Sequence, residues 1–189
     1  MLALSGAGLG AFASSAGATP PNDALGALGA ADLAYARLLI GWELLTVDFY
    51  THAVGSGHLD RVTADAARLA LANEQAHYTY LAGVLAGAGD VALTAADIDF
   101  TYPNGAFYTA RSVLHLAVTL ENYSLGTCLG AGGNIANPAL ASAVAQIAAN
   151  EAQHLSVLSL RSGTPAFQDA FPATMTMEVS SDALDNYTA

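Results

Sequence analysis

Glutamate and histidine form a pattern that occurs twice in this sequence. In each half of the chain, one glutamate is followed 30 or 31 residues later by a second glutamate, with a histidine three positions further on. The residues are Glu43, Glu74 and His77 in the first half, and Glu121, Glu151 and His154 in the second. The chain has only five glutamates and five histidines, so two such motifs exceed what chance predicts. We interpret the sequence as two degenerate copies of one structural unit.

Four long stretches around these glutamates have the pattern of amphipathic α-helices. Each lacks interior proline and carries apolar residues at helical spacing, over residues 31–55, 62–87, 106–130 and 138–161. Short connections predict that the first two and the last two form antiparallel hairpins, whereas the longer segment 87–105 predicts a crossover along the bundle. The expected fold class is all-α, an antiparallel four-helix bundle of two hairpins joined by a long crossover.

Residues at the ends of these stretches predict where the helices begin. We expect Asp32 to cap the first helix, and Thr63 or Asp65 to start the second. Asn137 followed by Pro138 combines a capping residue with a first-turn proline at the start of the fourth helix.

The chain length of 189 residues predicts one domain with flanking segments. The bundle is expected over residues 31–161, after a leader over residues 1–30. A tail over residues 162–189 contains two prolines and then a short helical pattern near residues 178–187, which we expect to pack on one end of the bundle.

The helical phase of the four glutamates predicts that they point into the bundle. At about 100° per residue, each glutamate falls within an apolar stripe, and each motif histidine shares the stripe of its glutamate. Burying carboxylates without cations is costly, and the five arginines lie off these stripes or near helix ends. Two divalent ions would neutralise the carboxylates and use both imidazoles as donors, whereas the alternative is a decayed site with protonated or water-bridged carboxylates. The predicted metal ligands are Glu43, Glu74, His77, Glu121, Glu151 and His154.

In their order and spacing, these motifs resemble those of the ferritin-like di-iron or di-manganese carboxylate proteins. Within that superfamily the sequence is most similar to bacterial exported ferritin-like domain proteins, through residues 120–123, 126–132 and 147–155. The resemblance covers residues 31–161. It implies a ferritin-like bundle that holds two Fe or two Mn ions, and mixed oxygen and nitrogen ligands also exclude copper(I).

The same resemblance implies roles for individual residues. Two glutamates bridge the ions, either Glu74 with Glu151 or Glu43 with Glu121, and each motif histidine caps one ion. Some relatives carry an aspartate before the metal-binding glutamate, where it orients a histidine of the neighbouring helix. This chain has an asparagine at both positions, which can accept the same hydrogen bond without adding charge. Two tyrosines near the ligands are expected to bond a ligand or pass an electron, or else to be core residues with a satisfied hydroxyl. These outer residues are Asn73, Asn150, Tyr50 and Tyr78.

Other cofactors of such proteins do not fit this sequence. Relatives with haem use a methionine on a helix, but the methionines here are Met1, Met175 and Met177, outside the predicted bundle. The single cysteine, Cys128, excludes an iron–sulfur cluster and a four-cysteine iron site held by this chain, and we expect it to be a small buried hydrophobe. We therefore expect no haem and no iron–sulfur cluster.

The resemblance implies redox chemistry with O2 or H2O2. Ferroxidase-like iron oxidation or peroxide removal is the leading expectation. A manganese-catalase-like reaction is an alternative enzyme activity, because the same six ligands would serve it. A non-catalytic alternative is an exported envelope or stress-associated structural protein in which the metal only stabilises the bundle. Assembly into oligomers is left open.

Charge and the amino-terminal segment limit partners and location. Sixteen acidic residues against five basic ones give a formal charge of −11, which argues against nucleic acid and acidic lipid surfaces as partners. Residues 2–18 form an uncharged Ala/Gly-rich run that ends in Ala16-x-Ala18, which is typical of a signal peptide. The usual basic region is missing, so either the true start lies upstream of Met1 or the segment is only a leader. We expect an exported protein with no membrane span in its mature chain.

Overall fold

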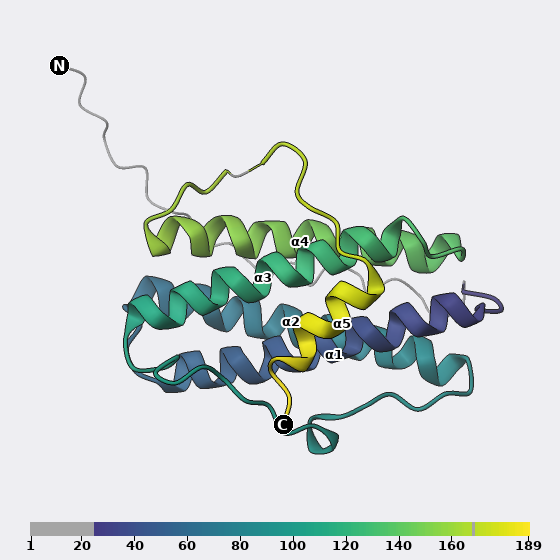
Figure 1. The fold of residues 1–189 in the computed structure, drawn as a ribbon, viewed down its shortest axis with the longest axis horizontal. Coiled ribbons are helices and arrows are strands. Elements are labelled where there is room, and N and C mark those ends of the chain that lie inside the picture. The colour runs from purple at the N-terminus through teal and green to yellow at the C-terminus, as the bar shows by residue number, and fades with distance from the viewer. Residues whose placement is uncertain (1–24, 168) are drawn as a thin grey trace.

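The computed structural model describes residues 25–167 and 169–189, and within them the regular structure is helical (Figure 1). The bundle consists of α1 (Ala30–Gly55), α2 (Arg61–Gly87), α3 (Ala110–Gly132) and α4 (Pro138–Ser162), and the tail contains α5 (Met177–Asp185). In these two ranges no strand occurs, and Phe100 and Thr188 form an isolated antiparallel bridge. The predicted all-α bundle is confirmed. The expected signal segment falls on residues 1–24, outside the described part of the chain.

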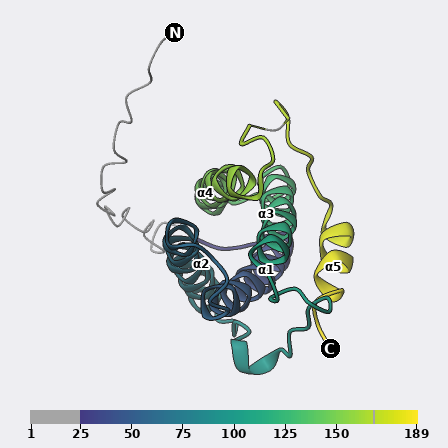
Figure 2. The ribbon, with the colours of Figure 1, turned by 90° about the vertical axis from the view of Figure 1, so that its left-hand side faces the viewer.

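The four long helices pack as two antiparallel hairpins, α1 with α2 and α3 with α4, that lie side by side (Figure 2). The crossover over residues 88–109 runs the length of the bundle from the end of α2 to the start of α3 (Figure 1), and it contains the 3-10 helix Ala95–Asp97. As a result α2 runs parallel to α3 and antiparallel to α4. Among the described helices, none has the length and hydropathy required to cross a membrane.

Asp32 does not cap α1 as the sequence predicted, because the helix begins earlier, with Gly29 as the capping residue. One oxygen of the Asp32 carboxylate accepts a hydrogen bond from the Gly29 amide at 3.1 Å. The other accepts one from the Ala136 amide at 2.8 Å, in the connection between α3 and α4. The side chain is buried and ties the start of α1 to the second hairpin.

The other helix starts follow from local capping. The second helix begins after Asp60, whose carboxylate accepts a hydrogen bond from the Thr63 amide at 2.9 Å, so neither predicted start is the capping residue. The third helix begins four residues later than predicted, because Thr109 caps it. The predicted start of α4 is confirmed: the Asn137 side chain accepts hydrogen bonds from two amides of the first turn, and Pro138 opens the helix.

The hydrophobic core is divided by the layer of glutamates at mid-bundle. One apolar cluster contains residues of the first part of α1 and the later part of α2, including Leu39 and Leu81. The other contains residues of the later part of α1 and the first part of α2, including Phe49 and Ala67. Helices α3 and α4 contribute to both clusters. The four glutamates therefore lie between two blocks of apolar side chains, remote from either end of the bundle.

The tail packs along the side of the bundle, against α1 and α3, and not on one end as the sequence predicted (Figure 2). The Met175 amide donates a hydrogen bond to the Gly126 carbonyl of α3 at 2.9 Å. One turn later on α3, a Cβ at Gly130 would lie 1.9 Å from the Met175 carbonyl oxygen. Glycine on this face of α3 is what allows the two backbones to approach so closely.

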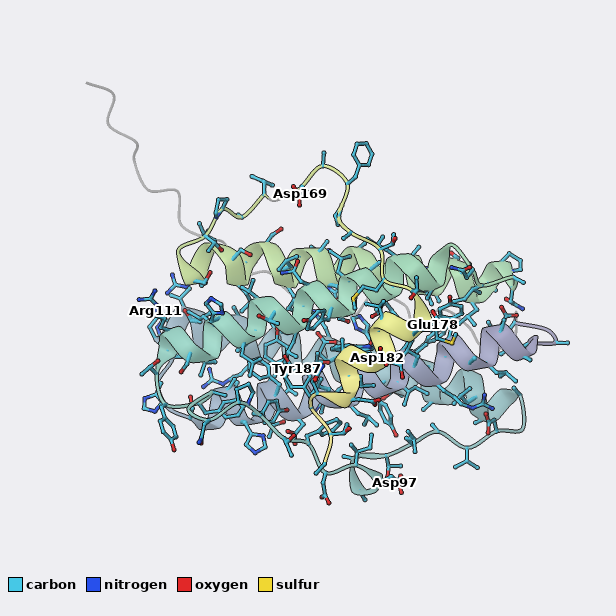
Figure 3. The ribbon with its side chains drawn as sticks, in the orientation of Figure 1. Asp97, Arg111, Asp169, Glu178, Asp182 and Tyr187 are labelled. Carbon is cyan, nitrogen blue, oxygen red and sulfur yellow. The ribbon has the colours of Figure 1, made fainter. Side chains whose placement is uncertain are left out.

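Helix α5 is amphipathic and packs across α1 and α3. Its exposed residues Glu178 and Asp182 lie on its outer side (Figure 3), whereas Ser180 is fully buried. The Ser180 hydroxyl accepts a hydrogen bond from the Trp42 indole of α1 at 2.8 Å and lies 2.6 Å from the Thr127 hydroxyl of α3. Three helices thus meet in one buried polar contact.

Candidate metal centre

The six predicted ligands meet at the centre of the bundle. Each of the four glutamates is fully buried, with 0 % of its surface exposed. The side chains of His154 and His77 are 8 % and 14 % exposed. Each long helix contributes its mid-helix glutamate, and α2 and α4 add the histidine one turn later, as the helical phase predicted.

Donor atoms in the centre fall into two overlapping groups. In each group the nitrogen and oxygen atoms all lie within 4.8 Å of one another. Bonds of about 2.1 Å would place donors on opposite sides of one ion about 4.2 Å apart, so each group has the size of a single-ion site. The first group is Glu43, Glu74, His77 and Glu151, and the second is Glu74, Glu121, Glu151 and His154.

The two glutamates of the ExxH motifs are shared between the halves of the centre. Glu74 directs Oε2 toward Nδ1 of His77, at 3.4 Å, and Oε1 toward Nδ1 of His154, at 2.9 Å. Glu151 divides its two oxygens in the same way, at 3.3 Å and 3.5 Å. The sequence alone left open which pair of glutamates is shared. The packing of α2 against α4 places Glu74 and Glu151 between the two histidines, so they are the shared pair.

The other two glutamates each belong to one half. Oε2 of Glu43 lies 3.4 Å from Nδ1 of His77, and Oε1 of Glu121 lies 3.6 Å from Nδ1 of His154. Each half therefore has one glutamate and one histidine of its own, in addition to the shared pair.

Nine buried polar atoms of this cluster have no hydrogen-bond partner among the described residues. They are both carboxylate oxygens of Glu43, Glu74 and Glu151, Oε2 of Glu121, and Nδ1 of His77 and His154. The histidine nitrogens contact these carboxylates as ion pairs, but two imidazoles face four carboxylates, and a buried polar atom without a partner costs about 1–3 kcal/mol. All nine atoms face the same small volume. This donor set fits a pair of divalent cations, which would satisfy these atoms together.

Burial and charge shift the pKa values of the cluster. Burial raises the pKa of Glu43 well above its ordinary value of 4.5, and that of Glu121 to about 7. Burial disfavours charge on His77, but contacts with three carboxylates outweigh it and raise its pKa to about 12. The pKa of His154 is raised for the same reason. For the two shared glutamates, contacts with both histidines outweigh burial and lower the pKa.

Two of the predicted outer residues contact a ligand. The Tyr50 hydroxyl of α1 donates a hydrogen bond to Oε1 of Glu121 on α3. Burial, together with the charge of Glu121, raises the pKa of Tyr50 well above its ordinary value, so the hydroxyl retains the proton that it donates. Asn73 on α2 places its side-chain amide 2.9 Å from Nε2 of His154 on α4.

The other two predicted outer residues make no such contact. The Tyr78 hydroxyl donates to the backbone carbonyl of Leu93 in the crossover, at 3.0 Å, and so fastens the crossover to α2. Of the two alternatives stated for Tyr78, this contact fits a tyrosine whose hydroxyl is satisfied elsewhere, because its position next to His77 in sequence turns it about 100° away on the helix. Asn150 forms no hydrogen bond with His77 within the described ranges.

The expectation that Cys128 is a small buried hydrophobe is confirmed, since the side chain lies in one of the two apolar clusters. The thiol is buried, and burial together with the charges of Glu151 and Glu43 raises its pKa well above the ordinary value. Its position seven residues after Glu121 matches the spacing of Tyr50 from Glu43.

Comparison with protein families agrees with this architecture. Residues 31–163 match the ferritin-like domain family, which is most of the chain. The chain belongs to this family. A search of curated proteins finds no match. The ferritin-like match ends immediately after α4, so the tail and α5 lie outside the matched region.

Proposed function

We propose that this ferritin-like protein holds two iron or two manganese ions and reacts with O2 or H2O2. The observation that carries the proposal is the division of the Glu74 and Glu151 oxygens between the two histidines. One ion would be held by Glu43 and His77 and the other by Glu121 and His154, with Glu74 and Glu151 between them. Ferroxidase-like iron oxidation or peroxide removal is the leading activity.

The chemistry that such ions supply is electron transfer: two ions that each give one electron convert one H2O2, with two protons, into two waters. The residues of this chain support that reaction in three ways. Four carboxylates offset the charge of two divalent ions inside an apolar bundle, and two imidazoles add neutral donors. The apolar clusters on both sides exclude bulk water from the centre. His77 is the most exposed of the six, so its side chain is the part of the centre that solvent reaches.

Oxidation assays test the activity. Metal-free full chain, reloaded with Fe(II), is expected to consume O2 or H2O2 in proportion to protein, and reloading with Mn(II) tests for release of O2 from H2O2. Glu74→Ala, which removes a shared ligand, is expected to abolish turnover. His115→Ala is the matched control, because His115 is exposed on α3. Turnover that is equal in both variants would refute the proposal.

A stabilising metal without turnover is the second candidate function. The nine unsatisfied buried atoms favour it, because a cation would stabilise this bundle whether or not it reacts. Thermal melting with and without a chelator, alongside the oxidation assays, separates the two functions. A large loss of stability on chelation without any consumption of oxidant would support the purely structural role.

We also propose that the protein is exported. The support is the uncharged Ala/Gly-rich run over residues 2–18 with alanines at positions 16 and 18. Expression of the full chain with its natural upstream region, followed by fractionation and amino-terminal sequencing, tests this. An extracytoplasmic protein that begins near Thr19 is expected, and an uncleaved cytoplasmic protein would refute export.

A further inference from the structure

The internal repeat that pairs the ligands also pairs the residues around them. An offset of 78 residues relates Glu43 to Glu121, and the same offset relates Tyr50 to Cys128. An offset of 77 residues relates the two ExxH motifs, and it also relates the asparagines before them, Asn73 and Asn150. The two halves of the centre can therefore be compared position by position.

The glutamates that belong to single halves differ in their outer partners. Glu121 accepts a hydrogen bond from the Tyr50 hydroxyl through Oε1, which leaves Oε2 free. At the equivalent position the other half has Cys128, and both oxygens of Glu43 lack a hydrogen-bond partner within the described residues. Glu121 is thus held in one orientation by α1, whereas among the described residues no hydroxyl holds Glu43, whose Oε2 lies 3.4 Å from Nδ1 of His77.

The two motif histidines also differ in their outer partners, and the half that contains Glu121 again has the additional contact. The Asn73 side chain contacts Nε2 of His154 on the side of the ring opposite Nδ1, which faces the carboxylates. An amide can rotate to present its oxygen, so this contact also serves the tautomer in which Nε2 carries the proton and Nδ1 is free. In the described ranges, Asn150 donates no hydrogen bond that would orient His77. The His77 side chain is also more exposed than that of His154.

We propose that the two halves of the centre are unequal, and that the half formed by Glu121 and His154 binds its ion first and more tightly. This inference rests on the proposed function. Outer hydrogen bonds that orient a metal ligand are typically worth 10- to 100-fold in affinity. Tyr50 and Asn73 supply two such bonds to one half, and their counterparts supply none to the other. Ligands already held in place lose less conformational freedom on binding.

Titration of the metal-free full chain with Mn(II) tests this, with calorimetry for affinity and the electron paramagnetic resonance signal of the aqueous ion to count free Mn(II). Two binding steps in the natural protein would not decide the question. The first ion neutralises the shared carboxylates, and this weakens the binding of the second ion even if the two halves are equal.

The deciding comparison is between Glu43→Gln and Glu121→Gln, which remove the same charge from opposite halves. We expect Glu43→Gln to keep the tight step within about threefold and Glu121→Gln to lose about 10-fold or more. Equal losses, or the reverse order, would overturn the inference.

A second pair of variants leaves every ligand in place. Tyr50→Phe removes only the hydroxyl that holds Glu121, and Cys128→Ala changes the equivalent position in the other half. Tyr50→Phe is expected to weaken the first step about 10- to 100-fold and to narrow the ratio between the two dissociation constants. Cys128→Ala is expected to leave both unchanged. Because a general loss of packing would not change that ratio selectively, an unchanged ratio in Tyr50→Phe would overturn the inference.

Failure of the proposed function gives a different result. Natural protein that binds no Mn(II) would refute the metal centre itself. Natural protein that binds two ions, with losses that do not depend on which half is changed, would refute only the inequality of the halves.

Discussion

Asn73 on α2 contacts His154 on α4 across the bundle, with 2.9 Å between the amide nitrogen and Nε2 of the ring. The contact links the two helices that provide the shared glutamates. It also turns Nδ1 of the same ring toward Glu74, at 2.9 Å. Asn73, one position before a shared glutamate, therefore orients the predicted histidine ligand of the opposite helix.

Removal of a predicted ligand is expected to lower the metal content. Glu121→Ala or His154→Ala should reduce bound metal well below two ions per chain, because each removes a donor that belongs to one half of the centre. Elemental analysis of protein purified from its native host measures this. His115→Ala, a change at an exposed histidine of α3, is the matched control. Unchanged stoichiometry in the ligand variants would exclude those residues from the site.

Stability of the metal-free chain is expected to fall as pH rises above about 4.5. Glu121 holds its proton to about pH 7 when folded and to about 4.5 when unfolded, so folding becomes less favourable across that interval, and Glu43 acts in the same direction. His77, with its pKa raised to about 12, adds stability that is complete below pH 6.5 and is lost toward pH 12. The lowered pKa values of the shared glutamates oppose this trend only below about pH 4.5.

Metal should reverse this dependence, because its ligands bind in their deprotonated forms. We expect the stabilisation by Mn(II) to increase between pH 5 and pH 8. Chemical denaturation at several pH values, with and without Mn(II), measures both trends. A metal-free stability that rises through the interval from pH 4.5 to 7 would contradict the assigned shifts.

Gly130→Ala is expected to displace the tail from α3. The added Cβ would lie 1.9 Å from the Met175 carbonyl oxygen, and backbone in that position cannot move without loss of the Met175–Gly126 hydrogen bond. Overpacking of this kind costs about 1–3 kcal/mol in the free energy of unfolding. Gly132→Ala on the same helix is the control, since its Cβ would meet nothing within 4 Å. Equal stability of the two variants would show that the tail does not dock there.

Ser180→Ala is expected to weaken the attachment of α5 to the bundle. It leaves the buried Trp42 indole without its acceptor, which costs about 1–3 kcal/mol in the free energy of unfolding. Because Trp42 is the only tryptophan, its fluorescence emission reports directly on this contact. A shifted emission maximum with lower stability is expected, whereas Ser181→Ala, one position along α5, should change neither. An unchanged spectrum in Ser180→Ala would contradict the contact.

Much of the candidate site could be predicted because helical geometry is local. A spacing of three residues places Glu74 and His77 on one face of a helix whatever surrounds it. The apolar stripe around Glu121 likewise indicates that this carboxylate points inward. The same local rules predicted the start of α4 at Asn137 and Pro138, where the capping atoms and the amides that they satisfy lie within three residues of one another.

Contacts between distant residues could not be predicted in this way. Asp32 looked like a helix cap, but one of its partners is the Ala136 amide, 104 residues away. From the sequence, Tyr50 and Tyr78 were equal candidates for contact with a ligand. Of the two, Tyr50 makes that contact because α1 packs against α3, whereas Tyr78 faces the crossover. The tail was expected on one end of the bundle, and the close approach allowed by Gly130 places it along the side.

The sequence by itself determined that six ligand side chains lie on the inner faces of four helices, because periodicity and charge are properties of each helix alone. Only the tertiary structure decided that Glu74 and Glu151 are the shared pair and that the two halves have unequal outer partners. The physical reason is that sharing and orientation depend on the angle and register at which separate helices meet. Packing of the whole core sets these quantities, and no single segment encodes them.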